Sequence, residues 1–265
     1  MHPILFEFGP LQIRFYGLMY AIGITCAVVL IRREVLRRHI PLSEDQVVNF
    51  VLASVLGGIL GARIYYVLFN WGSYRMDVWE VLKIWHGGLA IHGGVIGGTL
   101  AGWWYIRRHY AKFWRMADVA APTIILAQTF GRFGNFMNGD AHGVPTDMPW
   151  GIVFPSTSIA GYEYPDTPLH PVMLYELAIN LAIFLVLWGI RKRPWRDGFL
   201  FCLYCVLYSC GRFLVSGFRA DSLMLSLGGL GEFRMARVIS VLIIVAAGAV
   251  IATRRLWRTD APAEA

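Results

Sequence analysis

The sequence predicts an all-α integral membrane protein with about seven transmembrane helices and a small extracytoplasmic head of turns and short strands. Its 265 residues are 57% hydrophobic and only 15% charged, and the mean hydropathy is +0.53, which lies outside the balance of a soluble domain. Apolar stretches of the roughly 20 residues that a bilayer crossing needs recur along the whole length. We therefore expect one polytopic membrane domain over residues 1–265.

The apolar runs predict seven helices in turn along the chain. Their expected ranges are 15–31, 47–69, 87–106, 117–137, 172–190, 198–217 and 235–252. The first range is followed by arginines rather than by a small-residue cleavage site, so we expect it to remain in the mature protein. An odd number of crossings places the two ends of the chain on opposite sides of the membrane.

The Lys and Arg residues of the predicted loops indicate the orientation. Fifteen of them lie in the loops at 32–38, 107–115, 191–196 and 254–258, whereas the alternate loops contain five. Because basic loops stay on the cytoplasmic side, we expect an extracytoplasmic N-terminus and a cytoplasmic C-terminus. These loops also explain the net charge of +7 through contact with anionic lipid, so no nucleic acid partner is expected.

The longest loop, at about 138–171, is the expected head insertion on the outer side. It contains four acidic residues and no Lys or Arg, and its repeated prolines argue against long helices. His142, His170 and Asp140 could be imagined as metal ligands, but no HExxH motif or paired i,i+4 ligands support such a site. We expect no metal and no cofactor.

The four cysteines lie inside predicted spans, at Cys26, Cys202, Cys205 and Cys210. A CxxC pair at 202–205 could indicate redox or metal chemistry, but no second pair accompanies it. We interpret all four as small side chains buried against lipid.

Four arginines fall within predicted spans, namely Arg63, Arg132, Arg212 and Arg237. Each costs on the order of 3 kcal/mol near the bilayer centre unless it finds a partner, a cavity or an interface. For Arg63 and Arg237 we favour a structural role, through snorkelling or ion pairing. For Arg132 and Arg212 we favour a functional role.

Arg132 and Asn135 are three residues apart, and Tyr208 and Arg212 are four apart, so each pair lies on one face of its helix. Guanidinium groups bind phosphate bidentately and do not deprotonate, which makes this combination suited to a phosphate. The alternative is that the arginines pair structurally with Asp140 or Glu176. The segment HPVMLYEL, which contains Glu176, is interpreted as mainly structural.

The stretch IHGGVIGG at 91–98 contains overlapping GxxxG repeats, and Gly57 and Gly61 form another. Such repeats let helix backbones approach closely, so packing alone explains the glycines. Packing does not explain His92, whose imidazole titrates near neutral pH. We expect the glycines to leave room for a ligand beside His92, which favours a functional role over that of a buried structural histidine.

Six blocks of the sequence, in order, resemble those of the bacterial prolipoprotein diacylglyceryl transferases. The blocks are FYGLMY at 15–20, GARIYYVLF at 61–69, IHGGVIGG at 91–98, GRFGNFMNGDAHG at 131–143, HPVMLYEL at 170–177 and YSCGRFLVSGFR at 208–219. The resemblance implies a seven-helix protein of the bacterial inner membrane with a periplasmic head. It also implies transfer of the diacylglyceryl unit of phosphatidylglycerol to the lipobox cysteine of preprolipoproteins, with release of glycerol 1-phosphate.

The resemblance carries the family's functional residues to nine positions of this chain. They are Tyr16, His92, Arg132, Asn135, Asp140, Gly143, Tyr208, Arg212 and Arg219. Two positions depart from the commoner pattern: Asp140 stands where the family usually has Glu, and Ser216 with Gly217 stands where many members have an acid beside an aromatic residue. The shorter Asp140 fits a tether for a neighbouring arginine better than a direct acid or base.

On this basis we expect His92 to help take the thiol proton while Arg132 and Arg212 neutralise the charge on the departing glycerol phosphate. The residues expected to position the lipid head group are Asn135, Tyr16 and Tyr208. Arg219, expected nearer the outer surface, would steer the head group or the peptide.

Two other classes of protein compete with this reading of the sequence. A membrane transporter of an anionic or lipid substrate would use buried arginines along an anion path, but the sequence has no internal repeat. An intramembrane protease would need a second membrane aspartate or a GxSxG motif, and neither is found in the sequence.

Overall fold

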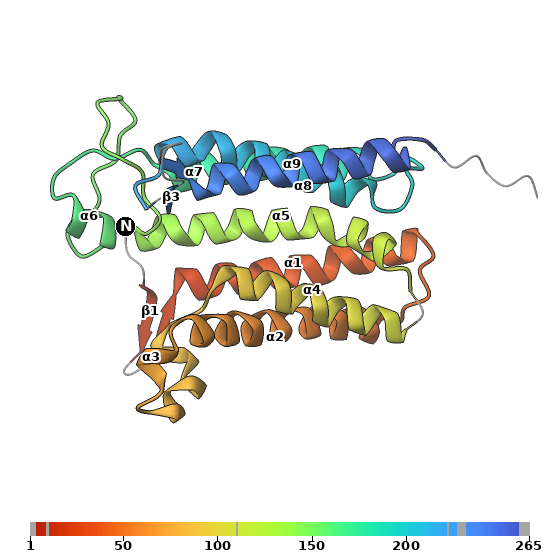
Figure 1. The fold of residues 1–265 in the computed structure, drawn as a ribbon, viewed down its shortest axis with the longest axis horizontal. Helices are drawn as coiled ribbons and strands as arrows, with labels where there is room; N and C mark the ends of the chain where they lie inside the picture. The colour runs from red at the N-terminus through yellow and green to blue at the C-terminus, as the bar shows by residue number, and fades with distance from the viewer. Residues whose placement is uncertain (1–3, 9–10, 110, 222, 227–231, 260–265) are drawn as a thin grey trace, which may run out of the picture. The chain divides into compact units, whose positions relative to one another are not determined.

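The computed structural model describes residues 4–8, 11–109, 111–221, 223–226 and 232–259, which are mostly helical (Figure 1). The chain divides into two compact units. Unit 1 comprises Met1–Ala27 with Ala117–Ala265, and unit 2 comprises Val28–Met116. Each unit is described by itself.

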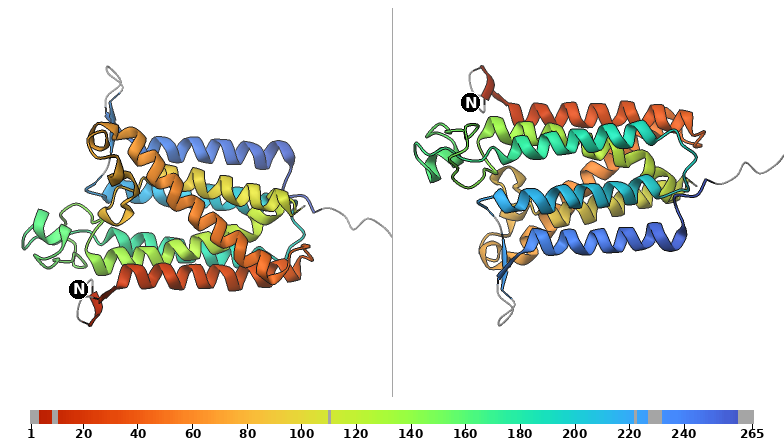
Figure 2. Two further views of the ribbon diagram at one scale, coloured as in Figure 1. Left: turned by 90° about the horizontal axis from the view of Figure 1, so that it is seen from below. Right: turned by 90° about the horizontal axis from the view of Figure 1, so that it is seen from above.

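Unit 2 is built around two long helices, α2 (Glu44–Phe69) and α4 (Ile91–Arg108). Between them lie three short elements, α3 (Trp71–Tyr74), η1 (Val78–Leu82) and η2 (Ile84–His86). Helix α2 begins with a capping box, in which the side chain of Ser43 accepts from the Gln46 N–H and the Gln46 side chain accepts from the Ser43 N–H. Figure 2 shows α2 crossing α4 obliquely, and the two helices are in contact.

Helix α4 begins four residues later than the predicted range 87–106. Gly87 and Gly88 adopt positive φ angles of 85° and 76°, which a helix does not accommodate, so the chain turns there before α4 begins.

Glycines bring α2 and α4 into backbone contact. A Cβ atom added to Gly93 would lie 2.2 Å from the carbonyl oxygen of Gly61, and one added to Gly97 would lie 2.2 Å from that of Gly57. No larger residue fits at these positions without moving a helix. The expectation that these GxxxG repeats bring two helices close together is confirmed.

Arg63 of α2 is buried and binds the backbone of the segment that follows it. The Arg63 guanidinium also lies 5.2 Å from the Tyr74 ring centroid. Its nitrogens donate to the carbonyl oxygens of Glu80 (2.6 Å), Val81 (2.9 Å), Lys83 (3.3 Å), Gly87 (2.5 Å) and Gly88 (3.1 Å). Arg63 therefore has the structural role that the sequence favours, because it holds segment 71–88 against α2.

Unit 1 contains the start of α1, most of α5 and three further long helices. The helices are α1 (Phe15–Arg37), α5 (Phe113–Asn138), α7 (Val172–Ile190), α8 (Phe199–Val215, extended by the 3-10 turn η3 at Ser216–Phe218) and α9 (Met235–Arg254). Helix α8 packs against both α7 and α9, as both figures of the fold show. Buried Asp118 of α5 accepts hydrogen bonds from the Gly198 and Phe201 N–H groups at 2.8 and 2.9 Å, which ties the start of α8 to α5.

The segment between α5 and α7 differs from the expected head of short strands. Its described elements are the short helix α6 (Ile159–Glu163) and isolated β-bridges such as Ile152–Leu169. The two-stranded antiparallel ladders lie elsewhere, as β1 (Ile4–Phe8) with β2 (Leu11–Arg14), and β3 (Met224–Ser226) with β4 (Glu232–Arg234). Proline lacks the N–H that a ladder requires, so the proline-rich segment forms turns instead.

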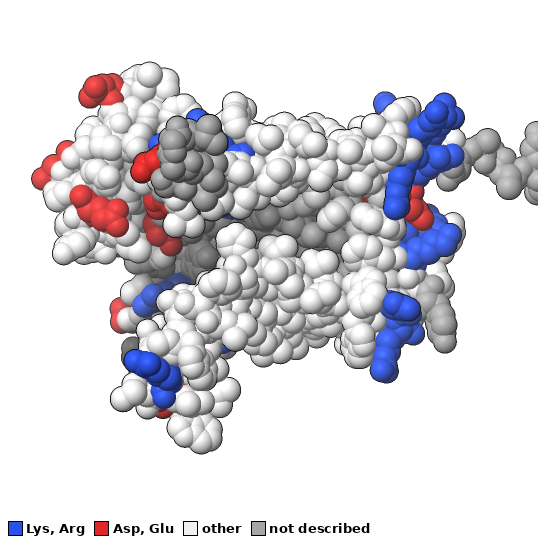
Figure 3. Space-filling view, viewed as in Figure 1, with Lys and Arg blue, Asp and Glu red and all other residues white. Residues whose placement is uncertain are grey.

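Charge is unevenly distributed over unit 1. In Figure 3 acidic side chains gather over the segment between α5 and α7, whereas basic side chains gather at the C-terminal end of α9. The small core of the acidic segment consists of Phe154, Ala160, Leu169 and Met173. The orientation of the chain in the membrane stays a prediction.

Five helices are long and apolar enough to cross a membrane by length and composition, among the residues the structure describes. They are α1, α2, α7, α8 with η3, and α9. Helices α4 and α5 form where two further spans were predicted, but they fall outside this set of five. Glycines and two terminal arginines reduce the apolar character of α4, and Asp118 and Arg132 reduce that of α5.

Candidate active site

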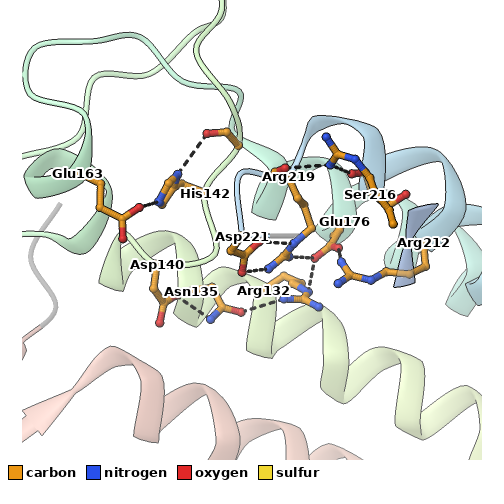
Figure 4. A network of polar contacts seen from close by, with 12 residues as sticks. Arg132, Asn135, Asp140, His142, Glu163, Glu176, Arg212, Ser216, Arg219 and Asp221 are labelled. Carbon is orange, nitrogen blue, oxygen red and sulfur yellow. Dashed lines mark hydrogen bonds and ion pairs between the residues drawn. The ribbon is translucent and has the colours of Figure 1, made fainter. Parts of the chain in front are cut away.

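The C-terminal end of α5 carries a chain of three polar side chains. Arg132 Nη1 donates to Asn135 Oδ1 at 3.3 Å, and Asn135 Nδ2 donates to Asp140 Oδ1 at 2.7 Å (Figure 4). The expectation that Arg132 and Asn135 share a helix face is confirmed. Because the amide accepts on one side and donates on the other, its orientation is defined. Asp140 therefore acts on Arg132 through Asn135 and not by direct contact.

Glu176, in the second turn of α7, is the point on which three arginines converge. Arg132 Nε lies 2.6 Å from Glu176 Oε2, and Arg212 Nη1 donates to Glu176 Oε1. Arg219 Nη1 lies 3.5 Å from Oε2. The arginines come from α5, from α8 and from the segment after η3, and Figure 4 shows them around the one carboxylate, whose side chain is 7% exposed. Three guanidinium groups thus share one buried negative charge.

Arg219 has a second acidic partner. Its Nε and Nη2 donate to Asp221 Oδ1 and Oδ2 at 2.8 and 2.6 Å, which is bidentate geometry. Burial alone raises the pKa of Asp221, but the hydrogen bonds from Arg219 outweigh it and hold that pKa below its ordinary value. The Arg219 side chain is buried, and its position nearer the outer side of the membrane stays a prediction.

Arg132 and Arg212 differ from Arg219 because part of each guanidinium is unused. Their side chains are 22% and 26% exposed. Within the part of the chain that the structure describes, Arg132 Nη2 and both Nε and Nη2 of Arg212 have no hydrogen-bond partner. The free Nε–Nη2 edge of Arg212 is the pair of donors that binds two oxygens of a phosphate side by side.

A small cavity lies beside the ion pairs. It is lined by Arg132, Glu176, Ile179, Asn180, Tyr208, Gly211, Arg212 and Val215. About 10 Å³ is open to the centre of a water molecule, which is room for roughly one water. A phosphate must therefore approach the two arginines from their exposed edges.

Tyr16 packs against α5 within unit 1. A Cβ atom added to Gly134 would lie 3.0 Å from Tyr16 Cδ2, and the Tyr16 hydroxyl lies 3.0 Å from that of Tyr20. The contact at Gly134 places Tyr16 beside the helical turn that carries Arg132 and Asn135. Tyr208 lies one turn before Arg212 on α8 and lines the cavity described above.

Gly143 connects its own backbone to two other segments of the chain, at His170 and at Arg219. Its N–H donates to the His170 carbonyl at 3.1 Å, and it forms a β-bridge with Arg219. A Cβ atom at this position would lie 2.5 Å from the His170 carbonyl oxygen, so only glycine fits. Neighbouring His142 is buried and its Nε2 lies 2.9 Å from Glu163 Oε2. Substrate binding by Gly143 stays a prediction.

His92 belongs to unit 2, in the first turn of α4. Its side chain is exposed, and its ring centroid lies 6.0 Å from that of Tyr65. No hydrogen bond to the imidazole forms among the described residues, so both ring nitrogens are open to a ligand or to water. Its role as a base stays a prediction.

Arg237 and Ser216 form a structural contact. Arg237 Nε donates to Ser216 Oγ at 3.2 Å, and its guanidinium lies 5.3 Å from the Phe213 ring centroid. This agrees with the structural role favoured from the sequence. Arg219 contacts the carboxylates of Glu176 and Asp221.

The sequence analysis assigned no functional role to Glu176, Asn180 or Asp221. The alternative that Arg132 and Arg212 pair with Glu176 is confirmed, and the Glu176 carboxylate lies at the centre of the arginine cluster. One signal was present: Glu176 and Asn180 are four residues apart in an otherwise apolar helix, and therefore lie on one face. No helical spacing linked Asp221 to this cluster.

The fold and the site together define a class of protein. Among the residues that the structure describes, five helices are long and apolar enough to cross a membrane. At one end of the helices of unit 1, two partly exposed arginines hold unused donors around a buried carboxylate. This is an integral membrane protein with a centre suited to binding an anion such as phosphate.

Comparison with known proteins identifies the family. The family model of prolipoprotein diacylglyceryl transferase matches residues 3–253. A phosphatidylglycerol–prolipoprotein diacylglyceryl transferase of Synechococcus elongatus is 40% identical over 248 residues, which cover 91% of this chain and 83% of the relative. One of Staphylococcus aureus is 39% identical over 256 residues, which cover 96% and 89%. The chain belongs to the prolipoprotein diacylglyceryl transferase family.

Proposed function

We propose that this chain transfers the diacylglyceryl group of phosphatidylglycerol to the thiol of the lipobox cysteine of preprolipoproteins and releases glycerol 1-phosphate. The family relationship and the names of the relatives support this activity. The structural observation that carries it is the pair Arg132 and Arg212, which converge on Glu176 and keep accessible donors for a second anion.

The reaction exchanges one bond to a glyceryl carbon for another. The cysteine sulfur attacks the carbon that bears the phosphate oxygen, a C–S bond forms, and the C–O bond breaks with its electrons going to the phosphate oxygen. The thiol proton passes to a base. A free thiol has a pKa of about 8.5 and is only a few per cent ionised at pH 7, so both activation of the sulfur and stabilisation of the leaving group are required.

Arg132 and Arg212 stabilise the leaving group in this proposal. Negative charge grows on the phosphate as the C–O bond breaks. Hydrogen-bond donors that are already in place stabilise this charge in the transition state without further reorganisation. The free edge of Arg212 and the free Nη2 of Arg132 supply these donors. Their fixed attachment to Glu176 keeps both groups oriented before the lipid arrives.

The surrounding residues orient the two arginines and the lipid head group. Asp140 orients Asn135, and Asn135 orients Arg132, so the carboxylate of Asp140 acts as an indirect tether. Tyr208 beside the cavity and Tyr16 beside α5 position the lipid head group. Arg219 is held by two carboxylates, and its contribution to binding comes through the shared Glu176.

His92 takes the thiol proton in this proposal. Its exposed imidazole has no hydrogen-bond partner among the described residues, and an imidazole is a suitable base near neutral pH. Replacement by Gln should reduce the rate of transfer more than lipid binding.

We place the protein in the bacterial inner membrane with seven crossings, the N-terminus and segment 138–171 outside, and the C-terminus in the cytoplasm. The excess of basic residues in alternate loops supports this orientation. Within unit 1 the acidic segment lies opposite to the basic C-terminal end of α9 (Figure 3), and Arg132 lies near the end of α5 from which this segment continues. The lipid phosphate and the exported peptide would then meet at the outer surface.

The proposed function is tested by incubating the purified protein with phosphatidylglycerol micelles and a lipobox peptide. We expect the peptide to gain the mass of a diacylglyceryl group on its cysteine, with release of one glycerol phosphate per peptide. A peptide with serine in place of that cysteine, and micelles of phosphatidylcholine, serve as controls. The absence of the thioether would contradict the proposal, and movement of lipid across vesicles that contain the protein, in a parallel assay, would then favour a transporter.

A further inference from the structure

Glu176 occupies one edge of each guanidinium group that would bind the lipid phosphate. Its Oε2 lies 2.6 Å from Arg132 Nε, and its Oε1 accepts from Arg212 Nη1 (Figure 4). The carboxylate is buried and its two oxygens are divided between two helices. Any phosphate bound by these arginines therefore shares them with a negative charge that stays in contact.

The charge of the phosphate changes during the reaction that we propose. The phosphodiester of the lipid carries one negative charge, whereas a phosphate monoester carries about 1.5 to 2 at pH 7 because its second pKa is near 6. Two arginines without a counter-charge would hold the monoester product more tightly than the substrate. Turnover then requires a group that lowers the affinity of the two arginines for the phosphate monoester.

We propose that Glu176 is that group: a specificity-determining residue that offsets part of the charge of Arg132 and Arg212 so that glycerol phosphate can leave. This inference rests on the proposed function. The partners of the third arginine agree with it, because Asp221 already binds Arg219 bidentately at 2.8 and 2.6 Å, whereas Arg219 Nη1 lies 3.5 Å from Glu176. The closest contacts of Glu176 are therefore with the two arginines that have free donors.

The dimensions of the site make this sharing necessary. The cavity beside Glu176 has room for about one water molecule, so a phosphate cannot enter between the carboxylate and the arginines. It binds the exposed edges while Glu176 keeps the buried edges. Replacement of the carboxylate by an amide of the same size removes the negative charge, keeps one oxygen acceptor beside the two arginines, and increases their attraction for anions.

Glu176→Gln tests this role, because glutamine keeps the volume and loses the charge. We expect the inhibition constant of glycerol 1-phosphate to fall about tenfold, comparable to the effect of one charge-assisted hydrogen bond. The KM for phosphatidylglycerol should fall in the same direction, and kcat should fall because the product leaves slowly. Pre-steady-state measurements should show a burst of one thioether per enzyme molecule, which a merely less stable enzyme would not give.

Glu163→Gln is the matched control, since Glu163 is half-exposed and binds His142 away from the arginines. We expect its kinetic constants to match those of the wild type. An unchanged or weaker inhibition by glycerol phosphate in Glu176→Gln overturns the inference. Failure of the proposed function is a different result, because the wild type would then form no thioether in the same assay.

The wild-type enzyme provides a second test that does not depend on the folding of a variant. Its inhibition by glycerol 1-phosphate is compared with that by glycerophosphoglycerol, the deacylated substrate, whose phosphodiester carries one charge. We expect inhibition constants within about threefold of each other, because Glu176 offsets the attraction for the extra charge. Inhibition by glycerol phosphate that is more than tenfold stronger contradicts the inference.

Discussion

Arg63 in unit 2 and the pair Arg132 and Arg212 in unit 1 show two outcomes for an arginine in an apolar helix. Arg63 donates to five backbone carbonyl oxygens through all three of its nitrogens and is buried. Arg132 and Arg212 each use part of the guanidinium on Glu176 and leave other donors exposed. A fully bonded guanidinium holds a backbone segment, whereas a partly bonded one keeps the capacity to bind an anion.

The largest expected effect is on the partly bonded arginines. Arg132→Ala or Arg212→Ala should reduce kcat/KM for thioether formation by about 1,000-fold, because each removes donors from the charge that develops on the leaving group. The thermal midpoint should change little, since Glu176 keeps other arginine partners. Arg254→Ala at the basic end of α9 is the control and should retain activity. Wild-type rates in either site variant would refute the proposal that Arg132 and Arg212 bind the phosphate.

The fully bonded arginine should show the opposite pattern. Arg63→Ala leaves several carbonyl groups without a donor and should reduce the free energy of unfolding by about 3 kcal/mol. Trypsin should then cleave more rapidly at Arg75 and Lys83, in the segment that Arg63 holds. Arg107→Ala, whose guanidinium stacks on Trp103, provides the control. Equal protease resistance in Arg63→Ala and the wild type would show that the carbonyl contacts contribute little.

Gly143→Ala should destabilise unit 1 by about 2 kcal/mol, because the new Cβ atom overlaps the His170 carbonyl oxygen. The displacement should also lower activity through the β-bridge to Arg219. Gly189→Ala has no atom within 4 Å of the added Cβ and should leave the thermal midpoint unchanged or slightly raised. Similar midpoints for the two variants would be inconsistent with the packing described.

Asp140→Asn tests the indirect contact from Asp140 through Asn135 to Arg132. It removes the charge that orients Asn135 and should lower kcat/KM about tenfold with little change in stability. Asp140→Glu should stay within a few-fold of the wild type, because it keeps the negative charge and lengthens the side chain by one methylene. Asp147→Asn, an exposed change in the same segment, should have no effect. A hundredfold loss in Asp140→Glu would indicate that reach, not charge, is limiting.

The smallest expected effect is the pH dependence of the Asp221 contact. Arg219 holds the pKa of Asp221 below its ordinary value of 3.8, so the ionised carboxylate stabilises the fold at neutral pH. That stabilisation is lost as the pH falls through 3.8 and below. It amounts to about 1 kcal/mol or less, because half of the Asp221 side chain is exposed. The difference in thermal midpoint between the wild type and Asp221→Asn should therefore be smaller at pH 4 than at pH 7. A larger difference at pH 4 would contradict the conclusion that the ionised carboxylate stabilises the fold.

Features that depend on neighbouring residues in the sequence were predictable. Apolar runs located the long helices, GxxxG spacing located the contact of α2 with α4, and the three-residue spacing put Arg132 beside Asn135. The start of α4 was missed because it depends on positive φ angles at Gly87 and Gly88. The ladder β3–β4 was not predicted because each of its strands has only three residues, too few to show an alternating pattern.

Contacts between distant segments were not predictable from spacing. Glu176 meets arginines from α5, α8 and the chain after η3, and no local pattern reveals that convergence. The alternative that Arg132 pairs with Glu176 was stated from the sequence, but as a reason against function. The structure shows that such pairing leaves donors free, so pairing and anion binding are compatible.

Lipid binding by a double variant, Arg132→Met with Arg212→Met, tests the role of the two arginines most directly. Phosphatidylglycerol is titrated into wild-type and variant protein in neutral detergent micelles, with retention of helical content as the check on folding. We predict saturable binding by the wild type and at least 100-fold weaker binding by the variant. Equal affinities would contradict the conclusion that these guanidinium groups hold the phosphate.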